Sequence, residues 1–99
     1  MAPRRVVYSP AARRDLEDLY DYIADRASPQ IAFTYLSRIE ANCLDFADFP
    51  ERGTRRDDLE PGLRIVGFER RVTIAFHVSE TAVTIDRIFY GGRDFGRAY

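Results

Sequence analysis

A chain of 99 residues is the length of one domain, so we expect residues 1–99 to form a single unit without a separate cofactor-binding half. Its 45% hydrophobic and 31% charged residues are typical of a soluble globular protein, and no apolar run is long enough for a membrane helix or a signal peptide. The formal net charge of −1 argues against a general nucleic-acid-binding protein, whose surface would be basic overall.

The N-terminal half predicts one strand followed by two helices. Residues Arg5–Tyr8 are β-prone, and the pairs Ser9-Pro10 and Ser28-Pro29 each predict a helix start, because serine caps the first turn and proline lacks an N–H that would be unpaired there. Apolar residues then recur at helical spacing, at Leu16, Leu19, Tyr20, Ile23 and Ala27 and again at Ala32, Leu36, Ile39, Cys43 and Phe46. The very short connection predicts an antiparallel helical hairpin that ends before Pro50.

The C-terminal half predicts three strands after a polar connection at residues 50–62. The strand segments are Leu63–Phe68, Arg71–Val78 and Ala82–Tyr90, and the turns between them are short enough for hairpins. The middle segment alternates an apolar face with a face that carries Thr73 and His77. The order βααβββ therefore predicts an α+β fold, an antiparallel sheet with the helical hairpin packed on one face and the other face open.

The residue types exclude several kinds of chemistry. Cys43 and His77 are the single cysteine and histidine, so they form neither an internal disulfide nor a zinc site. A Cys43–His77 dyad is a weak hypothesis, because Cys43 lies on the apolar stripe of its helix, where a buried, inert thiol is expected. All 15 basic residues are arginine, so lysine chemistry is impossible. We expect a cytoplasmic protein with no metal and no cofactor.

Arginines of the sheet half are the first candidate binding residues, since the segment 61–99 carries more Arg than acid although the whole chain is slightly acidic. These candidates are Arg64, Arg71, Arg87 and Arg93. Arg87 interrupts a predicted apolar row formed by Val83, Ile85 and Phe89. A guanidinium there needs a carboxylate partner, so Arg87 either forms a structural ion pair, for instance with Asp86, Asp94 or Glu69, or takes part in binding.

The segment Tyr90–Tyr99 is the second candidate. Glycines at 91 and 92 allow the backbone to leave the last strand, and the residues beyond them are charged or aromatic. Arg and Tyr are enriched at binding hot spots, which favours a target-binding role for Tyr90, Arg93 and Phe95. The alternative is that Phe95 fills the end of the core and Arg93 pairs with a nearby acid.

Across residues 4–95 the chain resembles the RelE/ParE superfamily of toxins from bacterial type II toxin–antitoxin systems. The resemblance is carried by the element order, the Ser-Pro helix start, and the segments PGLRIVGF and RRVTIAFHVSETAVTIDRIFYGGRDF. It is closer to the ParE, or plasmid-stabilisation, branch, whose last strand is matched by Arg87, Gly91, Arg93 and Asp94. Tyr90 stands where that branch usually has His, and Phe76-His77 stands where Tyr-Arg is frequent.

Two functions are known on this fold. RelE-like members cut mRNA on the ribosome through basic residues and a C-terminal Tyr, whereas ParE-like members poison DNA gyrase by binding it. The RelE-like set includes lysines, which this chain lacks, and a third-strand arginine, which is replaced by Thr73. Only Arg93 and Tyr99 match that set, so the resemblance favours gyrase poisoning without a catalytic site. A ribosome-dependent endonuclease and a degenerate toxin that only binds its antitoxin are the alternatives.

The resemblance also implies partners. A cognate antitoxin, ParD-like or another DNA-binding type, is expected to lay an amphipathic segment across the toxin, and DNA gyrase is the expected target. No membrane partner and no direct sequence-specific DNA binding by the toxin alone are expected. The residues expected to meet the antitoxin or the target are Arg64, Arg71, Arg87, Tyr90, Arg93 and Phe95. Antitoxin binding is expected to combine apolar contacts with arginine–carboxylate pairs.

Overall fold

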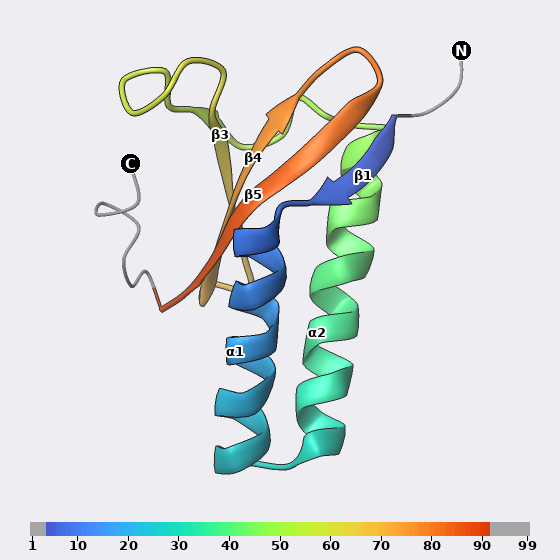
Figure 1. Ribbon diagram of the computed structural model, residues 1–99, viewed down its shortest axis with the longest axis vertical. Helices are drawn as coiled ribbons and strands as arrows, with labels where there is room; N and C mark the ends of the chain where they lie inside the picture. The colour runs from blue at the N-terminus through green and yellow to red at the C-terminus, as the bar shows by residue number, and fades with distance from the viewer. Residues whose placement is uncertain (1–3, 92–99) are drawn as a thin grey trace.

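A helical hairpin covers one face of a five-stranded sheet in the computed structural model, which describes residues 4–91 (Figure 1). The helices are α1 at Pro10–Arg26 and α2 at Pro29–Leu44, followed by the 3-10 helix η1 at Asp45–Ala47. The strands are β1 at Arg5–Tyr8, β2 at Thr54–Arg55, β3 at Arg64–Phe68, β4 at Val72–Val78 and β5 at Ala82–Tyr90. The predicted α+β fold is confirmed, and β2 is an additional short strand.

No helix of residues 4–91 is long and apolar enough to cross a membrane.

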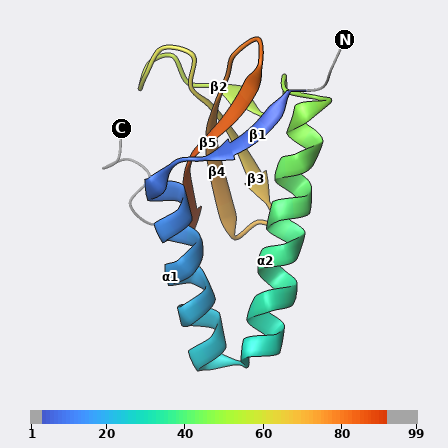
Figure 2. The same ribbon diagram turned by 45° about the vertical axis from the view of Figure 1, so that its right-hand side comes forward.

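The two serine–proline pairs begin the helices as predicted. The Ser9 hydroxyl accepts a hydrogen bond from the N–H of Ala12, and the Ser28 hydroxyl accepts one from the N–H of Ile31. Each bond pairs one of the N–H groups that the first turn of a helix leaves without a partner. Both helices lie against the same face of the sheet, and the tip of their hairpin extends beyond the sheet (Figure 2).

The sheet is mixed, whereas the sequence predicts an antiparallel one. Its order is β1-β5-β4-β3-β2, and three of the four strand pairs are antiparallel. The exception is β1, which pairs in parallel with β5, so that Arg5 lies opposite Ala82 and Tyr8 opposite Ile85. Two helices and three strands separate β1 from β5 in the chain, so no hairpin turn fixes the relative direction of this pair.

A β-bulge in β5 overturns the predicted apolar row of that strand. Ala75 of β4 pairs with Arg87 and Phe76 pairs with Ile85, which leaves Asp86 as the extra residue. After the bulge the alternation is reversed, so Ile88 joins the main core beneath the helices and Phe89 packs in a second cluster. Arg87 is therefore not part of one continuous apolar row with Ile85 and Phe89.

The main core lies between the helices and the sheet. Phe46 and Phe76 are fully buried and stack with ring centroids 4.7 Å apart. Cys43 is fully buried as predicted, and burial raises the pKa of its thiol to about 11. Burial also raises the pKa of Tyr8, whose hydroxyl interacts with that thiol. Cys43 therefore has the environment of an inert core residue.

The far face of the sheet is partly covered, although the sequence predicts an open face. The segment before β3 folds over it, so that Leu63, Ala75 and Phe89 form a small buried cluster. Leu59 and Ile65 pack against this cluster. The polar segment at residues 55–62 is itself held by short-range bonds, among them the one from the Gly62 N–H to the Asp57 carboxylate.

Candidate functional site

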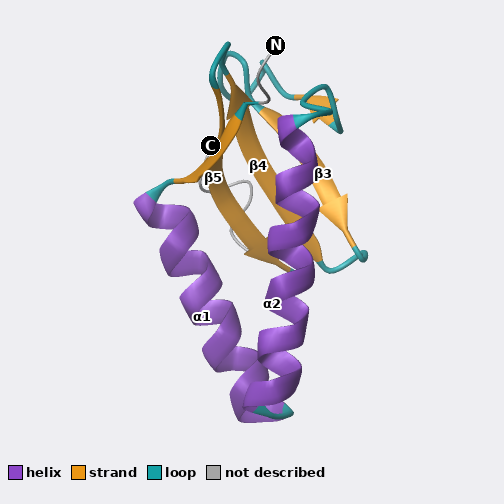
Figure 3. Cartoon of the chain, turned by 90° about the vertical axis from the view of Figure 1, so that its right-hand side faces the viewer, coloured by secondary structure: helices purple, strands orange, loops and turns teal. Residues whose placement is uncertain are grey.

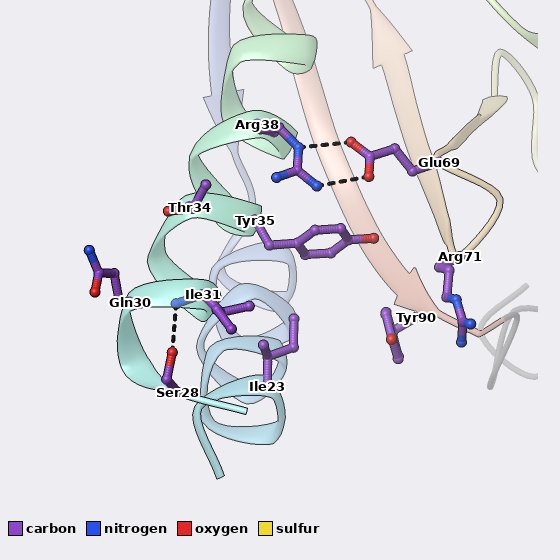
Figure 4. Close-up of a pocket in the computed structure, with 10 residues that line it drawn as sticks. All are labelled: Ile23, Ser28, Gln30, Ile31, Thr34, Tyr35, Arg38, Glu69, Arg71 and Tyr90. Atoms are coloured by element: carbon purple, nitrogen blue, oxygen red, sulfur yellow. Dashed lines mark hydrogen bonds and ion pairs between the residues drawn. The ribbon is translucent and has the colours of Figure 1, made fainter. Parts of the chain in front are cut away.

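A groove of about 710 Å³ lies where the hairpin tip extends past the end of the sheet. One wall comes from both helices and the other comes from the β3–β4 turn and the end of β5 (Figure 4). Its lining residues are Ile23, Ser28, Gln30, Ile31, Thr34, Tyr35, Arg38, Glu69, Arg71 and Tyr90. The lining combines apolar and aromatic side chains with two arginines and one carboxylate, which suits an amphipathic peptide.

Most of the helical wall consists of α2 residues beside the core stripe of that helix. Ile31, Tyr35 and Arg38 are spaced three or four residues apart, so they share one side of α2. Ile31 is 56% exposed although it is a large apolar residue. Figure 3 shows α2 in front of the sheet, and the Tyr35 ring packs against Phe68 at the end of β3.

An ion pair closes one side of the groove. Arg38 donates two hydrogen bonds to Glu69, at 2.9 and 2.8 Å, from α2 to the β3–β4 turn. This pairing lowers the pKa of Glu69 and raises that of Arg38. Glu69 and Arg70 both have positive φ, which makes the turn tight and aims Glu69 at the helix. Because both side chains are exposed, we expect this pair to contribute little to stability.

Two of the predicted site residues, Arg71 and Tyr90, meet in this groove. Arg71 lies in the β3–β4 turn directly before β4 and Tyr90 is the last residue of β5, and the Gly91 N–H donates to the Arg71 carbonyl beside them. The Tyr90 ring also packs against Tyr22 of α1, with centroids 5.5 Å apart. Tyr90 thereby joins the groove to a smaller pocket of about 290 Å³ beside α1, which Arg87 also lines.

Arg87 forms a structural ion pair with Asp15 of α1, a partner that the sequence analysis does not name. Its guanidinium donates to both carboxylate oxygens of Asp15, at 2.8 and 3.0 Å. The same carboxylate accepts a hydrogen bond from the Ile88 N–H at 2.9 Å. Ile88 lies in the part of β5 that extends beyond its pairing with β1. The suggested partners Asp86 and Glu69 bond to His77 and Arg38 instead.

The other predicted site residues do not join the groove. Arg64 lines a separate pocket of about 530 Å³ and donates a 3.0 Å hydrogen bond to the Arg52 carbonyl. Arg93, Phe95 and Tyr99 lie outside the described residues, as does Asp94, the third suggested partner of Arg87. Tyr35, Arg38 and Glu69 line the groove without having been predicted. The signal that could have found them is the row Ile31, Tyr35, Arg38, which lies beside the core stripe of α2.

His77 is enclosed by acceptors on the covered face of the sheet. Its Nδ1 bonds to the Asp86 carboxylate, and its Nε2 lies 3.2 Å from both the Glu60 carboxylate and the Pro61 carbonyl. The ring thus ties β4 to the bulge of β5 and to the segment before β3. Both ring nitrogens therefore have acceptors of this chain within hydrogen-bond distance.

Burial of Asp86 predicts a pH effect on stability. Burial raises the pKa of this carboxyl and His77 acts against the rise. A carboxyl whose pKa is raised in the folded state ionises first in the unfolded chain, so its contribution to stability is lost as pH rises through its folded pKa. As the pH rises above about 4, the ordinary pKa of an aspartate side chain, wild type is therefore expected to lose stability relative to Asp86→Asn. Urea denaturation of both proteins at a series of pH values measures the effect, and parallel curves would contradict it.

The chain matches a protein family across most of its length. The family described as ParE toxin of type II toxin-antitoxin system, parDE, matches residues 6–95. No curated protein sequence gives a significant match.

Solved structures with the same fold come from other toxin–antitoxin proteins. A chain from the chromosomal ParDE system of P. aeruginosa superposes with a TM-score of 0.76 at 23% identity, covering 88% of this chain and 95% of its own. A chain of the RelBE2 toxin–antitoxin complex of Mycobacterium tuberculosis gives 0.62 at 21% identity, covering 90% and 99%. YafQ from E. coli gives 0.52 at 17% identity, covering 94% and 99%. At these identities the likeness establishes the fold.

Proposed function

The chain belongs to the ParE toxin family of type II toxin–antitoxin systems, and we propose that it acts in the cytoplasm by binding and poisoning DNA gyrase. We further propose that its cognate antitoxin neutralises it by docking in the groove between α2 and the β3–β4 turn. The observation that carries the second proposal is the convergence of Arg71 and Tyr90, two predicted binding residues, in an exposed groove with apolar walls.

The groove has the properties of a binding site for an amphipathic antitoxin segment. Ile23, Ile31, Tyr35 and Tyr90 provide apolar surface, while the arginines can pair with carboxylates. An antitoxin also accompanies the toxin in the P. aeruginosa ParDE system and in the M. tuberculosis RelBE2 toxin–antitoxin complex. A partner that fills this groove would cover the side chains that the fold leaves exposed there.

The described residues favour gyrase binding over RNA cleavage. Cleavage of RNA needs a base, a cation at the scissile phosphate and an acid for the leaving oxygen. His77 is enclosed by Asp86 and Glu60, and Cys43 is buried in the core. The RelE-like arginine position on the third strand of the predicted order is occupied by Thr73. A protein that poisons gyrase by binding needs none of these groups.

Replacing Ile31 by glutamate is expected to weaken antitoxin binding at least a hundredfold, because it puts a charge on the apolar wall of the groove. Titration of each toxin variant with purified antitoxin by isothermal calorimetry measures the change. Phe33→Glu is the matched control, since Phe33 is 68% exposed on the same helix but does not line the groove. Equal losses for both variants would mean that the groove is not the docking site.

Expression of the toxin without its antitoxin distinguishes the two targets in cells. Gyrase poisoning predicts filamentation and DNA damage, whereas a ribonuclease would cause rapid translation arrest with new mRNA ends.

We propose that Arg64, Arg87 and the segment Tyr90–Tyr99, including Arg93 and Phe95, contact the antitoxin or the target. Deleting residues 93–99 is then expected to abolish growth arrest while antitoxin binding persists, and a truncated protein that still arrests growth would contradict this role.

A further inference from the structure

We propose that the groove contains a receptor for one carboxylate of the antitoxin, formed by the Arg71 guanidinium and the Tyr35 hydroxyl. The receptor would select an amphipathic antitoxin segment that carries a single Asp or Glu within its apolar face. The inference rests on the proposed function, because it takes the antitoxin to be the molecule that fills the groove.

The Tyr35 hydroxyl is a polar group whose hydrogen-bonding capacity is unused. It is shielded from solvent and has no hydrogen-bond partner among residues 4–91. Its ring is held edge-on against Phe68, with centroids 5.9 Å apart, and the Arg38 guanidinium lies 5.1 Å above the ring centre. A shielded hydroxyl without a partner is unfavourable for the free toxin. An incoming acceptor would remove that penalty on binding.

Arg71 provides the charge. It is exposed, and no carboxylate of the described part of the chain lies within ion-pair distance of it, whereas the other groove arginine, Arg38, is paired with Glu69. Figure 4 shows the Tyr35 hydroxyl directed from α2 across the groove toward the wall formed by the β3–β4 turn, which carries Arg71, and by the end of β5, which carries Tyr90. Burial raises the pKa of Tyr35, and Glu69 and Tyr90 raise it further. Arg38 and Arg71 act to lower it, so both cations lie close enough to influence the hydroxyl.

The charge of the groove favours an acidic occupant. Two arginines and one glutamate line it, and the ion pair between Arg38 and Glu69 leaves the positive charge of Arg71 in excess. A carboxylate can accept from the Arg71 guanidinium and from the Tyr35 hydroxyl at once, because each carboxylate has two acceptor oxygens. The Arg38–Glu69 pair beside this position is exposed and therefore weakly held, so it can shift when an occupant enters the groove.

The test measures the affinity of purified cognate antitoxin for toxins that lack each half of the receptor. Tyr35→Phe removes only the hydroxyl, and Arg71→Gln removes the guanidinium and its charge while keeping a polar side chain. Each is expected to weaken binding about tenfold, which is the loss of one charge-assisted hydrogen bond. The double variant is expected to lose less than the product of the two, because both groups serve the same carboxylate. Tyr20→Phe and Arg70→Gln, which leave the groove lining intact, are the matched controls.

Thermal unfolding of the free toxins separates binding from a structural role. Tyr35→Phe is expected to leave Tm unchanged or higher, since the hydroxyl loses no partner. Unchanged antitoxin affinity in both single variants would overturn the receptor, as would a Tm loss in Tyr35→Phe that accounts for its weaker binding. If Ile31→Glu weakens binding but these variants do not, only the receptor is wrong. If Ile31→Glu has no effect, the proposed docking site fails as well.

Discussion

Replacing Phe76 by alanine is expected to lower the free energy of unfolding by about 4 kcal/mol, because it removes a large side chain and leaves a cavity. Phe76 is fully buried in the main core and stacks on Phe46, so both the ring's own burial and its contact with the helical layer are lost. Domains of this size are stable by about 5–15 kcal/mol, so this loss is at least about a quarter of the free energy of unfolding. We expect Tm to fall by about 20 °C, measured by circular dichroism.

Phe49→Ala is the matched control for this prediction. Phe49 has the same side chain but is 63% exposed just after η1, so its loss is expected to change stability by less than about 1 kcal/mol. A similar decrease in both variants would contradict the description of the core. The Phe76 variant should also lose antitoxin binding when its midpoint falls below the assay temperature, since the groove depends on the packing of helices on the sheet.

Asp15→Ala is expected to destabilise the protein by about 2–3 kcal/mol. The Asp15 carboxylate is largely buried and accepts hydrogen bonds from the Arg87 guanidinium and from the Ile88 N–H. Removing it leaves two donors without this acceptor, one of them a charged group at the interface of α1 and β5. Breaking a fully buried ion pair costs about 3–5 kcal/mol. We expect a smaller loss here, because the Arg87 side chain is 31% exposed.

Asp18→Ala provides the comparison for Asp15. Asp18 lies one turn further along α1 and is exposed, so its replacement is expected to be nearly neutral. Urea denaturation of the two variants measures the difference in free energy of unfolding. If they are equally stable, the ion pair does not hold α1 to β5.

The local features of the fold could be predicted because they depend on neighbouring residues. The serine–proline pairs determine where both helices begin, and the alternation of Val72, Ile74 and Phe76 identifies the buried face of β4. The strand β2 could not be predicted, because its two residues, Thr54 and Arg55, are exposed and show no apolar alternation. They form a strand only because the fold brings them beside β3.

The bulge at Asp86 is the main reason why the site could be predicted only in part. Strict alternation assigns Phe89 to the face of Ile85, whereas one inserted residue places them on opposite faces. The partner of Arg87 lies 72 residues away in the chain, at Asp15, so its identity depends on how the helix crosses the sheet edge. The groove likewise depends on tertiary structure, because it forms where the helical hairpin extends beyond the sheet.

Supercoiling by purified DNA gyrase in the presence of the purified toxin tests the central claim most directly. We expect the toxin to inhibit supercoiling and to increase cleaved DNA in the gyrase complex, and we expect added antitoxin to reverse both effects. The same preparation is expected to leave mRNA on programmed ribosomes intact. Unaffected gyrase together with new mRNA ends at the decoding site, lost on Arg93→Ala or Tyr99→Phe, would contradict the account and identify the toxin as a ribonuclease.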